Sequence, residues 1–354
     1  MNYTDNTKKL LINYASKYPK LEIRDIFKFL HQSALGCEHL VSSYERAVDY
    51  IKREAESLLD CGSTVVEPLD GSYSRVNLSA LSHGLSPETL GRLFFLSAKK
   101  EEQGIEALNA KLAVAEALIL NGELPFSYDE FVAARDEWKG KGYPAIHHSD
   151  TFRSNYSPAY RVISNEFVQY LPLFIEIDKR NSGVSLTVAI DGGSASGKTT
   201  LAQILSQVYE CTVFHMDDFF LRPEQRTPER FAQIGGNVDR ERFLSEVLIP
   251  MKNGETIIYR KFDCETFSLS QPTEVIPKRM TVIEGVYSMH YELSQYYDMT
   301  VFLDVSPEVQ RERIRKRNSE KVAERFFNEW IPLEHVYFDG MKVKERCDVC
   351  IGVR

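Results

Sequence analysis

The sequence predicts an α/β fold in which a parallel sheet flanked by helices follows a mostly helical N-terminal domain. Residues 1–178 carry apolar residues at three- and four-residue spacing, which is typical of amphipathic helices. After the polar segment 179–183, short strand-like runs alternate with helical segments, as in a parallel sheet covered by helices. We therefore expect two domains, 1–178 and 184–354.

Length and composition agree with two soluble domains. The chain has 354 residues, and a single hydrophobic core rarely serves more than about 250 to 300. Hydrophobic residues make up 43% of the sequence and charged residues 27%, as in soluble globular proteins. A net charge of -8 argues against a long nucleic acid as partner. Neither a secretory leader nor a membrane-spanning apolar run is present, so we expect a cytoplasmic protein without a membrane partner.

The six cysteines lack the spacing of a disulfide framework, which fits a reducing compartment. Cys347 and Cys350 form a C-x-x-C pair, but a zinc site normally needs a second pair or nearby histidines. We interpret this segment as a buried strand rather than as a metal or redox site.

The N-terminal domain is expected to contain helices at 3–18, 23–30, 40–59, 88–96 and 106–120. Ser86 and Pro87 are typical of a helix start, as N-cap and first-turn residue. Asn121 and Gly122 suit a left-handed helix end. In the C-terminal domain, β-branched runs predict strands at 186–190, 211–215, 280–283, 300–303 and 349–353.

The first of these strands leads into a match to G-x-x-x-x-G-K-[ST] without a mismatch. The matching residues and the one after them are Gly192, Gly193, Ser194, Ala195, Ser196, Gly197, Lys198, Thr199 and Thr200. The glycines allow a tight turn whose amides face phosphate oxygens. Lys198 is expected to reach the β- and γ-phosphates, and Thr199 to ligate Mg²⁺. A chance glycine-rich turn is the alternative, but the position between a strand and a helix favours a phosphate-binding P-loop.

Acidic residues at the ends of neighbouring strands indicate which reaction a bound phosphate would undergo. Asp217 and Asp218 come after the strand 211–215, where a carboxylate faces the phosphates and can accept a proton from an attacking hydroxyl. We favour Asp217 over Asp218 as this base, with a helix cap or turn as the structural alternative. Glu284 ends the strand 280–283 and resembles a Walker-B acid that holds Mg²⁺, unless it is only a turn residue.

The segment 307–318 is rich in arginine and predicts a helix with cations on more than one face. Its arginines are Arg311, Arg313, Arg315 and Arg317. A mobile lid of this kind neutralises charge on the phosphoryl group, and we expect Arg313 and Arg317 to do so. The alternative is a solvated charged face.

These segments resemble the uridine kinase and phosphoribulokinase branch of P-loop kinases over residues 186–354. The motifs that carry the resemblance are GGSASGKTT, HMDDFF, NVDRERF, RKFDCETF, VIEGVY and the arginine run. The resemblance implies a P-loop kinase sheet, ATP and Mg²⁺ as cofactors, and Asp217 as general base. It also implies that Asp239 and Asp263 lie near the acceptor, with Asp239 contacting ribose hydroxyls.

One departure concerns the acceptor. In uridine kinases a base-contacting histidine follows the Tyr-Asp-Phe motif, whereas Phe262 and Asp263 are followed here by Phe267. A pyrimidine edge without its partner costs about 1–3 kcal/mol. Uridine is therefore one candidate beside other nucleosides, ribosides and phosphorylated sugars. For Trp330, Tyr337 and Phe338 we favour packing of a closing helix over stacking on a substrate.

The N-terminal domain resembles no enzyme family that we can name. Two polar clusters stand out there. One is His31, Gln32 and Ser33 with Glu38 and His39. The other is His147, His148, Ser149 and Asp150 with Phe152, Arg153, Tyr156, Tyr160 and Arg161. Histidines of this kind are more often capping or surface residues. They could form a metal site only if the chain brought the two clusters together. The arginines and tyrosines could instead bind an anionic ligand or the kinase domain.

The leading prediction is an ATP-dependent kinase that phosphorylates a hydroxyl of a small metabolite, with a nucleoside first among acceptors. The alternative is a nucleotide-dependent regulator in which the kinase-like domain switches the N-terminal module. A separate N-terminal activity has no positive support. No Asn-Lys-x-Asp guanine motif is present, which disfavours a GTPase switch. A homo-oligomer is compatible with the sequence, which does not determine the oligomeric state.

Overall fold

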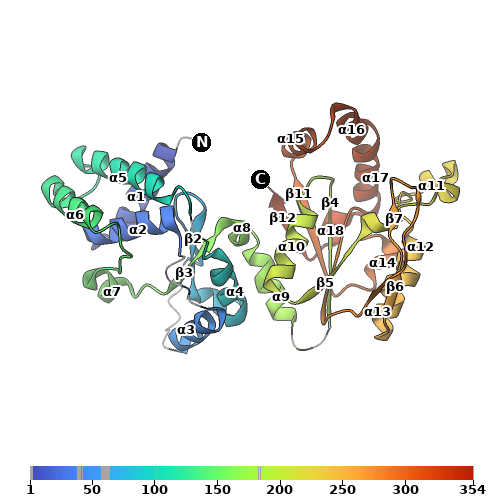
Figure 1. The fold of residues 1–354 in the computed structure, drawn as a ribbon, viewed down its shortest axis with the longest axis horizontal. Coiled ribbons are helices and arrows are strands. Elements are labelled where there is room, and N and C mark those ends of the chain that lie inside the picture. The colour runs from blue at the N-terminus through green and yellow to red at the C-terminus, as the bar shows by residue number, and fades with distance from the viewer. Residues whose placement is uncertain are drawn as a thin grey trace. The chain divides into compact units, whose positions relative to one another are not determined.

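The computed structural model describes residues 3–37, 41, 43–56, 64–99, 101–181, 183 and 185–353 (Figure 1). The chain forms two compact units, Met1–Lys179 (unit 1) and Arg180–Arg354 (unit 2). Within the described ranges, no helix is at once long and apolar enough to cross a lipid bilayer. The α/β fold class is confirmed, with a mostly helical first unit.

Helices make up most of unit 1. They are α1 (Tyr3–Lys17), α2 (Ile23–Leu35), α3 (Tyr44–Glu56), α4 (Pro87–Ser97), α5 (Gly104–Leu120), α6 (Tyr128–Gly140), α7 (Asp150–Tyr156), α8 (Asn165–Val168) and α9 (Leu171–Arg180). Ser86 caps α4 as predicted, since its hydroxyl accepts from the amide of Thr89 at 3.0 Å. Gly122 adopts the left-handed conformation, with φ = 70°. Parts of the predicted helix 40–59 lie outside the described residues.

Unit 1 also contains a small antiparallel sheet that the sequence pattern does not predict. Its order is β1 (Val66–Pro68), β2 (Tyr73–Asn77) and β3 (Tyr160–Ser164). The central strand β2 buries the polar side chains of Ser74 and Arg75. Strand predictions look for apolar residues at buried positions, so this strand gave no signal.

Unit 2 is built on a parallel five-stranded sheet in the order β12-β11-β4-β10-β5. The strands are β4 (Leu186–Gly192), β5 (Cys211–His215), β10 (Met280–Glu284), β11 (Met299–Val305) and β12 (Val349–Val353). They match the predicted strands because the inner three are continuous buried apolar runs. The order places the carboxyl ends of β4, β10 and β5 next to one another.

Helices cover both faces of this sheet (Figure 1). Helix α10 (Lys198–Val208) packs on β4, β5 and β10. The other face carries a core in which Ala189, Phe214, Ile283 and Phe302 contact residues from later segments, including α17 (Ile331–Met341). A third long helix of this unit is α15 (Pro307–Arg317). Its short helices are α11 (Pro228–Phe231), α12 (Arg240–Phe243), α13 (Ile249–Asn253), α14 (Tyr291–Ser294), α16 (Glu320–Arg325) and α18 (Val343–Arg346).

Two short antiparallel strand pairs lie beside the sheet, and along the chain the second lies between the strands of the first. One pairs β6 (Ile257–Tyr259) with β9 (Thr273–Val275), and the other pairs β7 (Phe262–Asp263) with β8 (Ser268–Leu269). The interpretation of 349–353 as a strand is correct, but its description as buried is wrong. Strand β12 is an edge strand, and Cys350 on it is exposed.

Candidate functional site

The predicted phosphate-binding loop joins β4 to α10. Gly192 has φ = 144°, and a Cβ there would lie 2.5 Å from the carbonyl oxygen of Leu303. Gly197 has φ = 98° and immediately precedes the first residue of α10. Ala195 also has a positive φ of 59°, which is uncommon for a residue with a Cβ. The backbone thus turns sharply between strand and helix, as a P-loop requires.

The polar side chains of the loop are held by local contacts. Lys198 is buried, and its ammonium donates to the carbonyl oxygens of Gly192 at 2.8 Å and Gly193 at 3.0 Å. Ser196 is also buried, and its hydroxyl oxygen has no hydrogen-bond partner among the described atoms. Thr199 and Thr200 are exposed at the start of α10. The nine predicted residues therefore run from the last residue of β4 through the loop into the first turn of α10.

Glu284 lies at the centre of the neighbouring strand ends. Its Oε1 accepts from the Thr199 hydroxyl at 3.1 Å and is 2.6 Å from Nδ1 of His215. The hydrogen bond that His215 donates to Glu284 raises the pKa of His215. A hydroxyl and a carboxylate this close are hard oxygen donors of the kind that Mg²⁺ prefers. Thr199 and Glu284 thus fit the predicted Mg²⁺ position, whereas the role of His215 was missed.

The two adjacent aspartates after β5 have different surroundings. Asp217 is open to solvent, yet the protein around it is dense enough for desolvation to raise its pKa, against the attraction of Lys198. Asp218 forms an ion pair with Lys261 at 2.9 Å. The charge of Lys198 therefore acts on Asp217, which has solvent access, while the carboxylate of Asp218 is already paired.

The arginines of α15 divide between two surroundings. Arg313 donates to the carbonyl oxygen of Ala195 at 3.2 Å, so it faces the loop. Arg317 is exposed and lies 6.0 Å from the ring centroid of Phe326. Arg311 and Arg315, one turn apart, lie over the ring of Phe327. Of the two arginines predicted to neutralise charge, only Arg313 contacts the loop in this conformation.

The predicted acceptor residues occupy two kinds of position. Asp239 is buried as the N-cap of α12, and its Oδ2 has no hydrogen-bond partner among the described atoms, although Nε of Arg242 lies 3.4 Å away. Asp263 is exposed and accepts from the amides of Glu265 and Thr266, and these hydrogen bonds lower its pKa. Asp239 therefore keeps an acceptor oxygen without a hydrogen bond, whereas Asp263 is engaged in the β7–β8 turn.

The aromatic residues of that hairpin form a small platform. Phe262 is buried, whereas Phe267 is exposed in a left-handed conformation with φ = 53°. Their ring centroids are 6.3 Å apart, and the Arg226 guanidinium lies 5.5 Å and 5.1 Å from them. The exposed ring of Phe267 is available for stacking rather than for hydrogen bonding.

Helix α17 contributes two contacts to the loop that the sequence did not indicate. Glu334 accepts from the backbone amide of Ser194 at 3.0 Å and from its hydroxyl. The Tyr337 hydroxyl donates to Asp191 at 2.7 Å. Asp191 is fully buried and also accepts from the amides of Gly192 and Met289. The predicted packing role fits Tyr337, which is buried, but does not describe its hydrogen bond.

Unit 1 contains a buried chain of hydrogen bonds from Asp25 through His148 to Tyr160, called the relay below. Asp25 is fully buried and accepts from the amides of Glu22 and Ser149, from the Ser149 hydroxyl and from Nδ1 of His148. Nε2 of His148 is 2.7 Å from the hydroxyl of Tyr160. Because Nδ1 must donate to the carboxylate, Nε2 of a neutral His148 accepts from that hydroxyl.

The relay continues to a buried arginine. The Tyr160 hydroxyl lies 3.4 Å from Oε1 of Gln32, and this oxygen accepts from Nε of Arg75 at 2.9 Å. Arg75 is 2% exposed and donates to Tyr14 and Glu67. The two polar clusters singled out in the sequence therefore meet at Gln32 and Tyr160.

Their meeting gathers no metal-binding group among the residues that the structure describes. No group of three His, Cys, Asp or Glu side chains suited to a metal ion occurs among the residues that the structure describes, and Glu38 and His39 lie outside them. His147 is exposed, Arg153 pairs with Asp150, and Arg161 pairs with Glu54. These contacts favour the structural interpretation of the clusters.

The stability of unit 1 is expected to fall as the pH falls from about 6.5 to about 4. Burial lowers the pKa of His148 from 6.5 to about 4. The unfolded chain therefore binds a proton at His148 in this window that the folded unit does not, so the contribution of His148 to the free energy of unfolding falls there and is constant above the window. Asp25, whose pKa is lowered, titrates below the window. Urea unfolding at several pH values measures the free energy of unfolding. In His148→Gln this free energy should depend less on pH within the window than in the wild type. An unchanged pH dependence would contradict the role given to His148.

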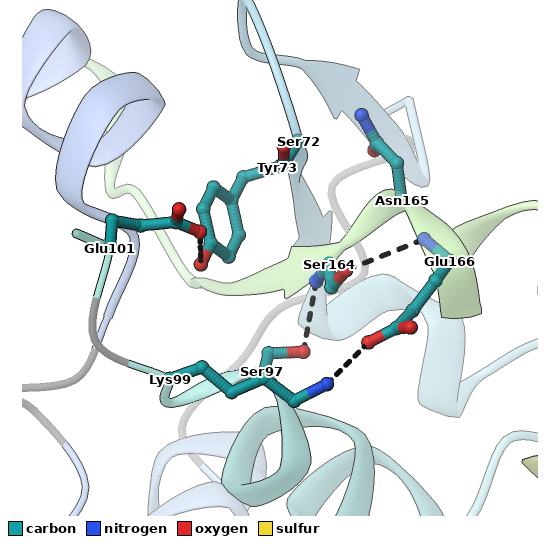
Figure 2. Close-up of a pocket in the computed structure, with 8 residues that line it drawn as sticks. All are labelled: Ser72, Tyr73, Ser97, Lys99, Glu101, Ser164, Asn165 and Glu166. Carbon is teal, nitrogen blue, oxygen red and sulfur yellow. Dashed lines mark hydrogen bonds and ion pairs between the residues drawn. The ribbon is translucent and has the colours of Figure 1, made fainter. Parts of the chain in front are cut away.

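A polar pocket of about 370 Å³ also lies in unit 1 (Figure 2). It is lined by Ser72, Tyr73, Ser97, Lys99, Glu101, Ser164, Asn165 and Glu166. Lys99 pairs with Glu166 at 2.9 Å, and the Tyr73 hydroxyl donates to Glu101 at 2.6 Å. Since these charged side chains are already engaged, the pocket does not indicate the charge of a ligand.

Comparison with known proteins places the likeness in unit 2. Residues 187–322 match the model of the phosphoribulokinase / uridine kinase family. A phosphoribulokinase of Synechocystis is 27% identical over 127 residues, which are 34% of this chain and 38% of that protein. A uridine kinase of Chlamydia pneumoniae is 26% identical over 148 residues, 39% of this chain and 65% of that protein. The chain thus spans less than two thirds of the length of either relative.

Solved structures include similar chains. A possible uridine kinase from Bacillus stearothermophilus has a TM-score of 0.40 at 25% identity, covering 52% of this chain and 96% of that one. A shikimate kinase from Aquifex aeolicus has a TM-score of 0.25 at 16% identity, covering 47% and 85%.

Proposed function

We propose that unit 2, a domain of the phosphoribulokinase and uridine kinase family, transfers the γ-phosphate of ATP to a hydroxyl of a small metabolite. The proposed acceptor class is nucleosides. The family match and the side chains at the ends of β4, β10 and β5 support this proposal.

One observation supports it most directly: three neighbouring strands deliver the groups that phosphoryl transfer needs. Strand β10 lies between β4 and β5, with Glu284 in register with Ile190 and His215. The P-loop follows β4, Glu284 ends β10, and Asp217 follows β5. A phosphate cradle, a metal-binding acid and a candidate base therefore share one edge of the sheet.

Each residue has a proposed role. The loop amides and Lys198 bind the phosphates, and Thr199 with Glu284 would hold Mg²⁺, which supplies positive charge at the phosphate oxygens when bound. Asp217 accepts the proton of the attacking hydroxyl, which its exposure to solvent permits. Arg313, next to the loop, neutralises charge on the transferred group.

Two features support a nucleoside or riboside as acceptor. Oδ2 of buried Asp239 accepts no hydrogen bond among the described atoms, although Nε of Arg242 lies 3.4 Å away and Nε of Arg222 3.8 Å away, so it can accept from a sugar hydroxyl. The exposed ring of Phe267 suits stacking against a flat base.

The test is to incubate the protein with Mg·ATP and a panel of nucleosides, ribosides and phosphorylated sugars, and to detect phosphorylated product by mass spectrometry. A monophosphorylated nucleoside is the expected product. ATP binding without any product would contradict the proposal and favour a nucleotide-dependent regulator. Product from a phosphorylated sugar alone would retain the kinase and overturn the acceptor class.

A further inference from the structure

Glu334 is the least expected group at the phosphate-binding loop. It lies 140 residues after Ser194, on α17, yet its carboxylate accepts from both the amide and the hydroxyl of that residue. The backbone amides of such a loop are the groups that bind phosphate oxygens. A side-chain anion therefore engages a donor in the loop that is proposed to bind nucleotide.

The local structure is built around this contact. Glu334 is only 3% exposed, and a buried carboxylate is costly unless donors surround it. A Cβ on Gly193 would lie 3.4 Å from Oε2 of Glu334 and 2.8 Å from Nε2 of Gln310, which donates to the carbonyl oxygen of Ser194. The glycine thus permits both side chains to close on the loop.

The helix that carries Glu334 is anchored independently. One turn further along, Tyr337 is fully buried and bonds to Asp191, whose other oxygen accepts from the amide of Gly192. Burial raises the pKa of Glu334, while the hydrogen bonds from Ser194 and the charge of Lys198 oppose that effect. Because Tyr337 binds Asp191 independently, α17 keeps this anchor whether or not Glu334 contacts Ser194.

We infer that Glu334 competes with nucleotide phosphates for the donors of Ser194, and so lowers the affinity of the loop for nucleotide. The inference rests on the proposed function, because it assumes that nucleotide binds at this loop. A carboxylate and a phosphate carry charge of the same sign, so they cannot share these donors without repulsion. Binding therefore requires Glu334 to move away from Ser194.

The test is isothermal titration of the full chain with Mg·ATP and, separately, with inorganic triphosphate. Glu334→Gln removes the charge, and Glu334→Asp withdraws the carboxylate by one methylene. Both variants are expected to bind both probes about tenfold more tightly than the wild type, the scale of one charge-assisted hydrogen bond. Glu329→Gln, an exposed glutamate paired with Arg325, is the matched control and should leave affinity unchanged.

The outcomes separate this inference from the proposed function. Unchanged or weaker binding by both variants, with circular dichroism showing that they are folded, overturns the role of Glu334 and leaves the kinase proposal intact. Tighter binding of triphosphate and Mg·ATP together supports competition at the phosphates. If neither the wild type nor the variants bind Mg·ATP, the proposed function fails and this inference fails with it.

Discussion

Replacing Asp217 with asparagine is expected to slow phosphoryl transfer by about 10²- to 10⁴-fold, the range that a general base contributes. The substitution keeps the size of the side chain but removes its ability to take a proton. Nucleotide binding should be nearly unchanged, because Lys198 and the loop amides are not altered. The measurement is kcat for the acceptor found in the panel, together with the dissociation constant of Mg·ATP.

Asp218→Asn is the matched control. This neighbouring carboxylate is held by Lys261, so its loss should perturb the local ion pair and slow transfer far less than the change at Asp217. Equal losses for the two variants would show that charge near the loop matters rather than a single base. Full turnover by Asp217→Asn would contradict the assignment of the base.

Sequence reasoning succeeded where structure follows from local pattern. The inner strands of the unit 2 sheet are buried on both faces, so each appears as a continuous apolar run. The loop at 192–199 combines special backbone angles with fixed spacing, as the φ of Gly192 and Gly197 illustrate. Both kinds of information lie within a few residues of one another, and a single sequence displays them.

The sequence did not predict the polar groups whose positions depend on contacts with residues far away in the chain. Glu334 gave no signal because nothing near it in the sequence indicates its contact with Ser194. Arg75 is buried in a strand where Gln32 accepts from its Nε and Tyr14 and Glu67 accept from its Nη1, and these partners are not adjacent in the sequence. Periodicity predicts exposed polar residues, and buried networks of this kind are its exceptions.

Replacing Asp25 with alanine is expected to destabilise unit 1 by about 3–5 kcal/mol, because several buried donors would each lose an acceptor at about 1–3 kcal/mol apiece. Four donors, from Glu22, Ser149 and His148, would lose their acceptor in the interior. Each such loss is costly because water does not reach the site to replace the carboxylate. The relay to Tyr160 would also lose the group that fixes the tautomer of His148.

Urea unfolding of the full chain measures this change if the two units report separately. The chain has two tryptophans, Trp138 in unit 1 and Trp330 in unit 2, so a Trp330→Phe background leaves fluorescence that reports unit 1 alone. Asp150→Ala is the matched control, since this exposed aspartate pairs with Arg153 along α7. A loss for Asp25→Ala no larger than that of the control would mean that the relay does not hold unit 1 together. A large loss with kinase activity retained would show that the relay supports the fold rather than the chemistry of unit 2.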